Sequence, residues 1–192
     1  MGAVDDTVWA VVLGAVLATL GGFAATQLEA FFRRRERERA AALLFGEILS
    51  VVELLLVLAD EARGRGDPYG AMTMRLLRAA RSETETYDRN RESLYDLRDA
   101  PVRAEIHTMM VRITLSMDGA FEAHDEIALL EAAGVAPESE EAARLERLRE
   151  ARQGSFDFAL EAVEAIHKIV AVLRPMARQP FGDHDAIARS YL

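Results

Sequence analysis

One run of residues near the N-terminus contains no charged side chain. It extends from Thr7 to Leu28 and lies between Asp6 and Glu29. A helix of these 22 residues would be about 33 Å long at ~1.5 Å per residue, which matches the ~30 Å thickness of a bilayer hydrocarbon core. The run therefore predicts a transmembrane helix.

Two other interpretations of this run agree less well with its flanks. A cleaved signal peptide has a basic segment before its apolar run, whereas Asp5 and Asp6 precede this one. A core helix of a soluble protein rarely continues for so many residues without a charge. An uncleaved membrane anchor is the interpretation that the flanking charges favour.

The segment after the apolar run is rich in arginine. Phe31 and Phe32 occupy the position of interfacial aromatic residues, and the residues that follow form what we call the basic collar, namely Arg33, Arg34, Arg35, Arg37 and Arg39. Basic residues beside a span keep that side of it in the cytoplasm. We therefore expect the N-terminus outside and the rest of the chain in the cytoplasm, with the collar against the lipid surface.

Small side chains recur every fourth residue within the predicted span. We call this set the small-residue ladder, and it consists of Ala10, Gly14, Ala18, Gly22 and Thr26. Such a face lets two helices approach closely in lipid, so it predicts contact with a second copy or with another membrane protein. The alternative is that alanine and glycine are simply common in this chain.

The composition outside the span restricts the class of protein further. The net charge of −9 belongs to residues 40–192, since residues 1–39 hold five arginines and five carboxylates. An acidic domain is a poor nucleic-acid binder. Cysteine is absent and Lys168 is the only lysine, which excludes disulfides and indicates a bacterial, arginine-rich coding bias.

The pattern after the collar predicts helices only. Apolar residues continue at helical spacing, so one helix is expected from Asp6 to about Arg63. A short helix should follow Asp67 and Pro68, and a capping-box pattern at Ser82 to Glu85 predicts a new helix as far as Leu97. Two long helices should complete the chain, one from Val102 to about Ala133 and one from Pro137 to Pro175 with a weak point at Gly154.

These expectations give one fold class and four parts of the chain. The fold is all-α, with a single N-terminal transmembrane helix that continues into a cytoplasmic up-and-down four-helix bundle. The parts are an anchor at 1–32, a basic juxtamembrane helix at 33–42, a helical bundle at 43–175 and a C-terminal tail at 176–192. The tail is either a loose end or a segment that docks on the bundle.

A resemblance emerges from the order of these features. The span, the arginine- and glutamate-rich collar and the leucine-rich helix are followed by Thr84-Glu85-Thr86-Tyr87-Asp88, with Asn90, Leu94 and Leu97 behind. This layout resembles small bacterial inner-membrane proteins of uncharacterised function, over about residues 5–130. The resemblance implies a topology and a fold, and no activity or catalytic residue.

Patterns typical of chemical sites are incomplete in this sequence. A di-iron bundle needs two Glu-x-x-His motifs, and only Glu164 to His167 supplies one. The serines lack a nucleophile-elbow context, and no glycine-rich phosphate loop is present. We therefore expect no catalytic residue, no cofactor and no metal. His124, beside an apolar stripe, is expected to be a hydrogen-bonded core histidine.

The sequence thus favours a non-catalytic single-span membrane protein that acts through protein–protein interaction. It would be an accessory or assembly subunit of a membrane complex, or a homo-oligomeric scaffold. A membrane-tethered regulator that relays a change from span to bundle is the alternative. A homo-oligomeric pore ranks lower, because only Thr19 and Thr26 could form a polar stripe.

Overall fold

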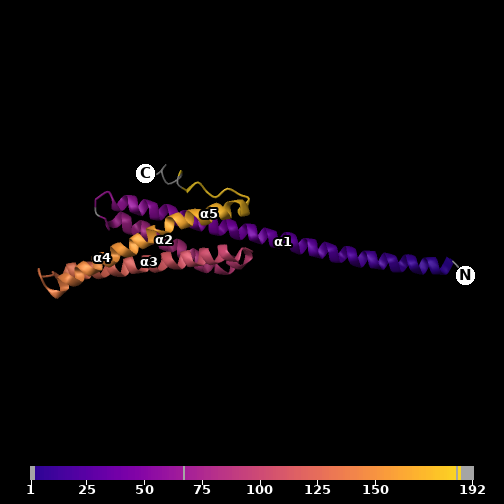
Figure 1. Ribbon diagram of the computed structural model, residues 1–192, viewed down its shortest axis with the longest axis horizontal. Helices are drawn as coiled ribbons and strands as arrows, with labels where there is room; N and C mark the ends of the chain where they lie inside the picture. Colours follow the sequence, from indigo (N-terminus) through magenta and orange to yellow (C-terminus); the bar gives the residue numbers. More distant parts are fainter. Residues whose placement is uncertain (1–2, 67, 185, 187–192) are drawn as a thin grey trace.

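The computed structural model of this protein is built from helices (Figure 1). It describes the backbone of residues 3–66, 68–184 and 186, and the side chains of the same residues except 3–12 and 15. No β-strand occurs within those ranges. The elements are α1 (Ala3–Arg63), α2 (Ala71–Arg89), the 3₁₀ helix η1 (Arg91–Asp96), α3 (Ala100–Ala133), α4 (Glu140–Leu160) and α5 (Ala162–Ala177).

Helix α1 is continuous over 61 residues and is therefore about 90 Å long at ~1.5 Å per residue. This confirms the prediction of one helix as far as Arg63. Its N-terminal half projects alone from the rest of the molecule (Figure 1). Its C-terminal half, from Ala41 onward, lies among the other helices, which we call together the packed region (residues 41–177).

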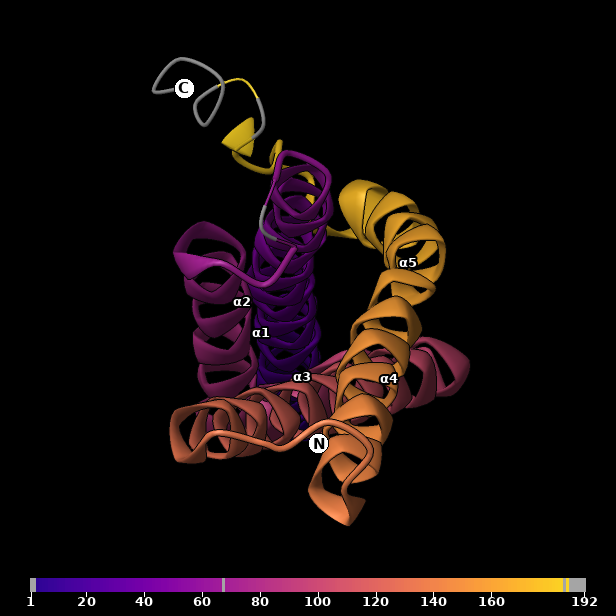
Figure 2. The same ribbon diagram turned by 90° about the vertical axis from the view of Figure 1, so that its left-hand side faces the viewer.

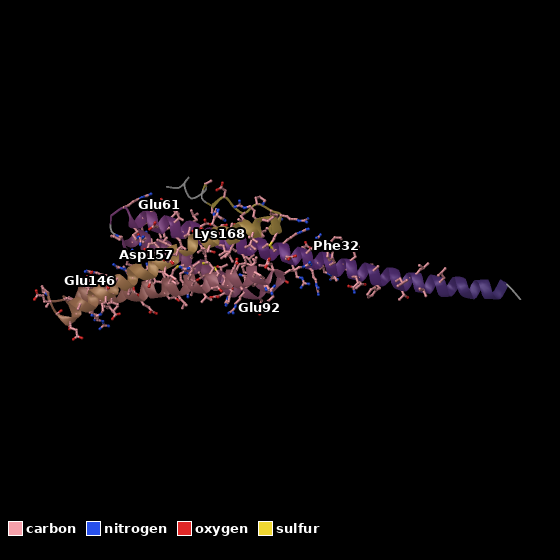
Figure 3. The ribbon with its side chains drawn as sticks, in the orientation of Figure 1. Phe32, Glu61, Glu92, Glu146, Asp157 and Lys168 are labelled. Atoms are coloured by element: carbon pink, nitrogen blue, oxygen red, sulfur yellow. The ribbon has the colours of Figure 1, made fainter. Side chains whose placement is uncertain are left out.

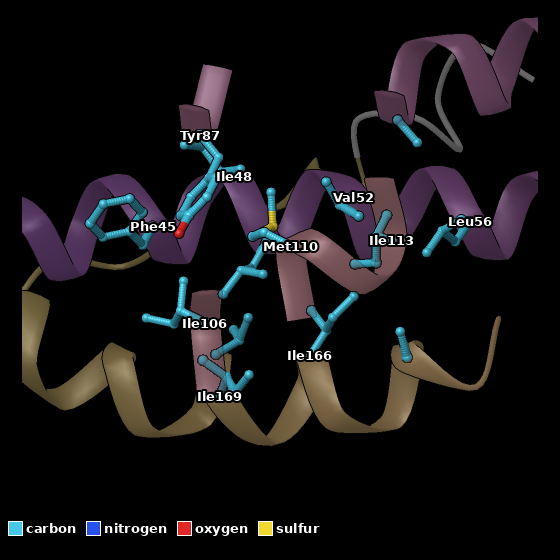
Figure 4. Close-up of a cluster of buried hydrophobic side chains, with 14 of the residues drawn as sticks. Phe45, Ile48, Val52, Leu56, Tyr87, Ile106, Met110, Ile113, Ile166 and Ile169 are labelled. Carbon is cyan, nitrogen blue, oxygen red and sulfur yellow. The ribbon is translucent and has the colours of Figure 1, made fainter. Parts of the chain in front are cut away.

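The core of the packed region forms where one face of α1 meets α2, α3 and α5. Phe45, Ile48, Val52 and Leu56 recur along α1 at helical spacing and are at most 4% exposed. In Figure 4 they face isoleucines and a methionine of α3 and α5, with Tyr87 of α2 at one end. Each such side chain stabilises the fold by about 1.5–3 kcal/mol when fully buried.

The view along the molecule shows α1 at the centre of this arrangement (Figure 2). Helix α2 lies on one side of α1 and α5 on the other, while α3 crosses below. Helix α4 packs mainly on α3, and α5 packs mainly on α1. The long α3–α4 hairpin extends past the rest of the packed region, at the end opposite the N-terminus (Figure 1).

The prediction of two helices between Pro68 and Leu97 is wrong in its boundaries. Helix α2 begins after Gly70, passes through Ser82 without interruption and ends at Arg89. Thr84, beside the predicted cap, donates its hydroxyl to the Arg81 carbonyl at 2.8 Å. Burial of one continuous face of α2 outweighs the local capping signal. Asp67, expected to precede the first of these helices, lies outside the described residues.

The ends of α3 follow from local chemistry and agree with the helix that the sequence predicts from Val102 to about Ala133. Asp99 accepts a hydrogen bond from the Val102 backbone N–H at 3.2 Å and caps the N-terminus. Gly134 adopts a left-handed φ of 76° at the C-terminus, a conformation that glycine reaches without strain. Helix α4 starts later than predicted, because Ser139 rather than Pro137 provides its cap, with its Oγ 3.1 Å from the Ala142 N.

The last long helix is divided, and the division is not at Gly154. That glycine lies inside α4 with open space around it, whereas the helix breaks between Leu160 and Ala162. The break occurs where the chain leaves α3 and turns onto α1 (Figure 2). A change of packing partner, and not a weak helix former, therefore decides where the helix ends.

The residues after α5 return along α1. The ring of Phe181 lies against the α1 backbone at Gly46, in the space that any Cβ at that position would need. Glu47 accepts a hydrogen bond from the Gly182 backbone N–H at 2.8 Å, and its other oxygen is 2.5 Å from Nε2 of His184. Of the two possibilities for this tail, the described part is a docked segment.

Candidate functional site

The N-terminal half of α1 exposes a belt of large apolar side chains, which we call the apolar belt. Between 43% and 65% of each side chain is exposed, and the belt comprises Leu13, Val16, Leu17, Leu20, Phe23, Leu28, Phe31 and Phe32. Figure 3 shows the side chains of the projecting helix standing away from the rest of the protein, with Phe32 near the packed region. By length and composition α1 is able to cross a membrane, the one described helix of which this is true.

Helix α1 contains a second apolar stretch, which must be distinguished from the belt. Nearly half of the residues in the most apolar described stretch of α1 are buried inside the protein. Every described side chain from 16 to 37 is exposed. The partly buried stretch therefore lies farther along α1, in the packed region. Its apolar character is explained by the core. The belt has no such cover.

The small-residue ladder remains untested by the structure. Gly14 and Gly22 have no atom of another element within 4 Å, and the side chain of Ala10 lies outside the described residues. Thr26 donates its hydroxyl to the Gly22 carbonyl of its own helix at 2.8 Å, so its polar group needs no partner chain. Space for a second helix is present along the ladder.

The basic collar is extended by residues from distant parts of the sequence. Arg98, in the turn before α3, lies 3.4 Å from the Glu38 carboxylate, to which its backbone N–H also donates at 3.3 Å. Arg178, just after α5, lines a small hollow of about 210 Å³ together with Arg35 and Arg39. Sequence reasoning missed both residues, because neither lies near the collar in the chain.

A larger hollow of about 550 Å³ lies between α1, α5 and the docked tail. Glu53 of α1 is 3.1 Å from Nδ1 of His167 on α5, and His184 also lines the hollow. Ser50 lines the hollow too, but it donates its hydroxyl to the Gly46 carbonyl at 2.8 Å. Each imidazole therefore meets a carboxylate and neither is placed against a nucleophile.

The single Glu-x-x-His motif is not assembled as a pair. Glu164 accepts from Lys168 at 2.7 Å, while His167 turns to Glu53. Glu164 is fully exposed, and the hydrogen bond and charge of Lys168 lower its pKa. Within the part of the chain that the structure describes, no three metal-binding side chains gather around one point.

His124 lies at the edge of the core and not inside it. Its ring is half-buried, and its Nδ1 is 3.2 Å from a guanidinium nitrogen of Arg152. Tyr87 and His107 form a comparable pair between α2 and α3, with the Tyr87 hydroxyl 2.9 Å from Nδ1 of His107. Burial raises the pKa of Tyr87, so its phenol remains protonated at neutral pH and serves packing.

An ion pair joins the far end of α1 to α4. Arg63 donates to Asp157 at 2.6 Å, and its guanidinium stacks 4.6 Å from the centre of the Phe156 ring. Burial opposes ionisation of Asp157, but hydrogen bonds from Arg63 and Gln153 and the charge of Arg63 outweigh it and lower the pKa of that carboxyl. Arg63 also donates to Asp60 of its own helix at 2.7 Å, so the guanidinium links two carboxylates and its role is structural.

Arg112 supports the break between α4 and α5. Its guanidinium donates to the Phe158 carbonyl at 2.9 Å and to Glu161 at 2.7 Å, and it lies 3.8 Å from the centre of the Phe158 ring. It therefore satisfies a carbonyl near the end of α4. The sequence shows only an arginine in an amphipathic helix, with no signal for this contact.

Known proteins add no information about this geometry. No family model, no curated protein and no solved structure matches the chain.

Proposed function

We propose that this chain is a non-catalytic, single-span protein of a bacterial inner membrane that acts through protein–protein interaction. It serves as an accessory or assembly subunit of a membrane complex, or as a homo-oligomeric scaffold. Residues 7–28 span the bilayer, the N-terminus lies outside, and the packed region lies in the cytoplasm as an up-and-down four-helix bundle. The topology agrees with the resemblance to small inner-membrane proteins described above.

The apolar belt is the observation that carries this proposal. Soluble monomers rarely expose a continuous apolar surface of this extent. The core of the packed region begins at Ala41 and includes no belt residue, so the belt has no role in closing that core. The uncharged run is long enough for a bilayer, and lipid is therefore the environment that it fits.

Charge supports the orientation. Asp5 and Asp6 precede the span, whereas five arginines follow it. This asymmetry is that of a span whose C-terminal side remains in the cytoplasm.

Interaction with protein is favoured by what the anchor and the packed region offer. A single span encloses no transport path, and the small-residue ladder leaves room for a second helix, either of another membrane protein or of a second copy. The hollow beside Glu53 and His167 places no nucleophile against its imidazoles. Acidic residues on the packed region make nucleic acid an unsuitable partner.

A second candidate is a membrane-tethered regulator. It is favoured by the continuity of α1, which passes from the span into the core without a break between Phe31 and Ala42. A rigid helix of this kind could transmit a rotation or shift from the membrane to the packed region. A proline at Arg37 would separate the two candidates, since it should abolish a relay and leave subunit association intact. A pore has the least support.

The first experiment is native electrophoresis of the chain extracted gently from its own membranes, followed by mass spectrometry of the band. A large band with other polypeptides supports an accessory subunit, and a band of several copies of this chain supports a scaffold. A monomeric band with turnover of a small molecule would contradict the proposal. Recovery of the chain in the soluble fraction would contradict the membrane anchor itself.

A further inference from the structure

The packed region has two ends of opposite charge. At the end beside the span, residues 33–39, residues 91–103 and Arg178 hold nine arginines and five carboxylates. At the far end, the α3–α4 hairpin between residues 125 and 150 holds three arginines and eight carboxylates. Figure 3 shows Glu146 at that far end, while Glu92 lies near the junction with the projecting helix.

The basic end is assembled by tertiary structure from three separate segments. Arg98 is fixed to α1 by its ion pair with Glu38, and Arg178 borders the same hollow as Arg35 and Arg39. Arg98 and Arg178 are both exposed. The arginine surplus around α1 is therefore wider than the collar and includes the end of the packed region.

This basic end lies close to the predicted lipid surface. Glu38, the partner of Arg98, follows Phe32 by six residues, which is about 9 Å along a helix axis. That distance is comparable with the Debye length of ~8 Å at physiological ionic strength. Charges at this end are thus near enough to interact with lipid headgroups around the anchor.

We propose that the membrane-proximal end of the packed region binds anionic phospholipid headgroups around its own anchor, through Arg98, Arg178 and the basic collar. This inference rests on the proposed membrane anchoring and adds a specific surface to it. The carboxylates at this end do not cancel its charge, since nine arginines stand against five carboxylates in these segments. The ion pair with Glu38 holds Arg98 beside the collar. Any orientation that brought the acidic hairpin to the same lipids would be disfavoured by repulsion.

The absence of cysteine from the chain allows a direct test on the full-length protein. A fluorophore on Gln179→Cys, beside Arg178, reports on the basic end, and one on Ala136→Cys reports on the far hairpin. Each labelled protein is placed in nanodiscs of phosphatidylcholine, with or without phosphatidylglycerol, that contain a trace of lipid with a quencher on its headgroup. Phosphatidylglycerol should increase quenching at position 179 and leave position 136 unchanged.

Variants separate the proposed contact from a general effect of charge. Each basic residue at an anionic surface raises the ratio of docked to undocked protein about fivefold. The double variant Arg98→Gln with Arg178→Gln should therefore lower this ratio about 25-fold. The corresponding double lysine variant should retain docking. Arg65→Gln with Arg147→Gln is the matched control, because it removes two arginines far from the collar, and it should behave as the original protein.

Three results would overturn the inference. They are no response of position 179 to phosphatidylglycerol, an equal loss in the control variant, or a response to an added acidic polypeptide and none to the lipid. Co-purification of the chain with the nanodisc is measured in the same samples. Failure to co-purify contradicts the anchor, whereas co-purification without a lipid response contradicts this inference alone.

Discussion

At the scale of single residues, two glycines of similar helical setting should respond in opposite ways to alanine. Gly154 has open space around it, whereas the ring of Phe181 fills the Cβ position of Gly46. Alanine favours a helix by about 1 kcal/mol over glycine, so Gly154→Ala should raise the free energy of unfolding by about that amount. Gly46→Ala should instead displace the Phe181 ring and release the docked tail.

Hydrogen exchange and urea unfolding in detergent measure both changes. In Gly46→Ala the amide of Gly182, bonded to Glu47 in the original protein, should exchange faster, and in Gly154→Ala its exchange should not change. An unaltered Gly182 amide in Gly46→Ala would show that Phe181 does not hold the tail.

The ion pair of Arg63 and Asp157 should make stability depend on pH in acid. The folded pKa of Asp157 is lowered, below the ~3.9 of an unfolded aspartate. Its contribution is therefore complete above that unfolded pKa and is lost as the pH falls through the folded pKa. The difference in unfolding free energy between the original protein and Asp157→Asn should shrink over this range.

The control for this pH dependence is the same substitution in an Arg63→Gln background. Without the guanidinium, the pH-dependent part of the difference should diminish, since Arg63 is the charge that lowers the Asp157 pKa. A difference that stays constant with pH in the original protein would contradict the role of the pair.

At the scale of elements, Arg112 should determine how firmly the α4–α5 junction is held. Arg112→Ala removes donors to the Phe158 carbonyl and to Glu161, and we expect a loss of about 1–2 kcal/mol. Hydrogen exchange should increase around residues 158–163 and stay unchanged in α2. Arg144→Ala, which removes an exposed ion pair with Glu126, should have little effect.

The small-residue ladder predicts which positions of the span contact a second helix. Gly14→Leu and Gly22→Leu should weaken association in the membrane, because they block close approach, and should leave insertion intact. Gly21→Leu is the matched control, since Gly21 is equally open and lies off the ladder. Crosslinking in native membranes measures association. Equal effects of all three variants would mean that the ladder is only composition.

At the scale of the whole molecule, the structure predicts that the packed region is independent of the span. Every residue of the core cluster follows position 40, so a fragment starting at Arg33 should fold and remain soluble without detergent. Circular dichroism and cooperative urea unfolding test this. A fragment that aggregates or unfolds without cooperativity would show that the N-terminal half of α1 supports the core.

The sequence by itself determined the features that depend on neighbours in the chain. The uncharged run and its flanking charges predict a membrane anchor, and apolar spacing predicts helices and the unbroken α1. Gly134, which acts within one turn, marks the C-terminal end of α3. Periodicity and capping are local, so they are legible without a fold.

Only the tertiary structure decided the features that depend on packing between distant segments. Helix α2 continues through a local cap signal at Ser82, and the last helix breaks at Glu161 where its packing partner changes. Phe181 lies on Gly46, and Arg98 and Arg178 extend the basic collar. Each of these contacts joins residues far apart in sequence, and its free energy comes from burial or charge pairing that no local pattern records.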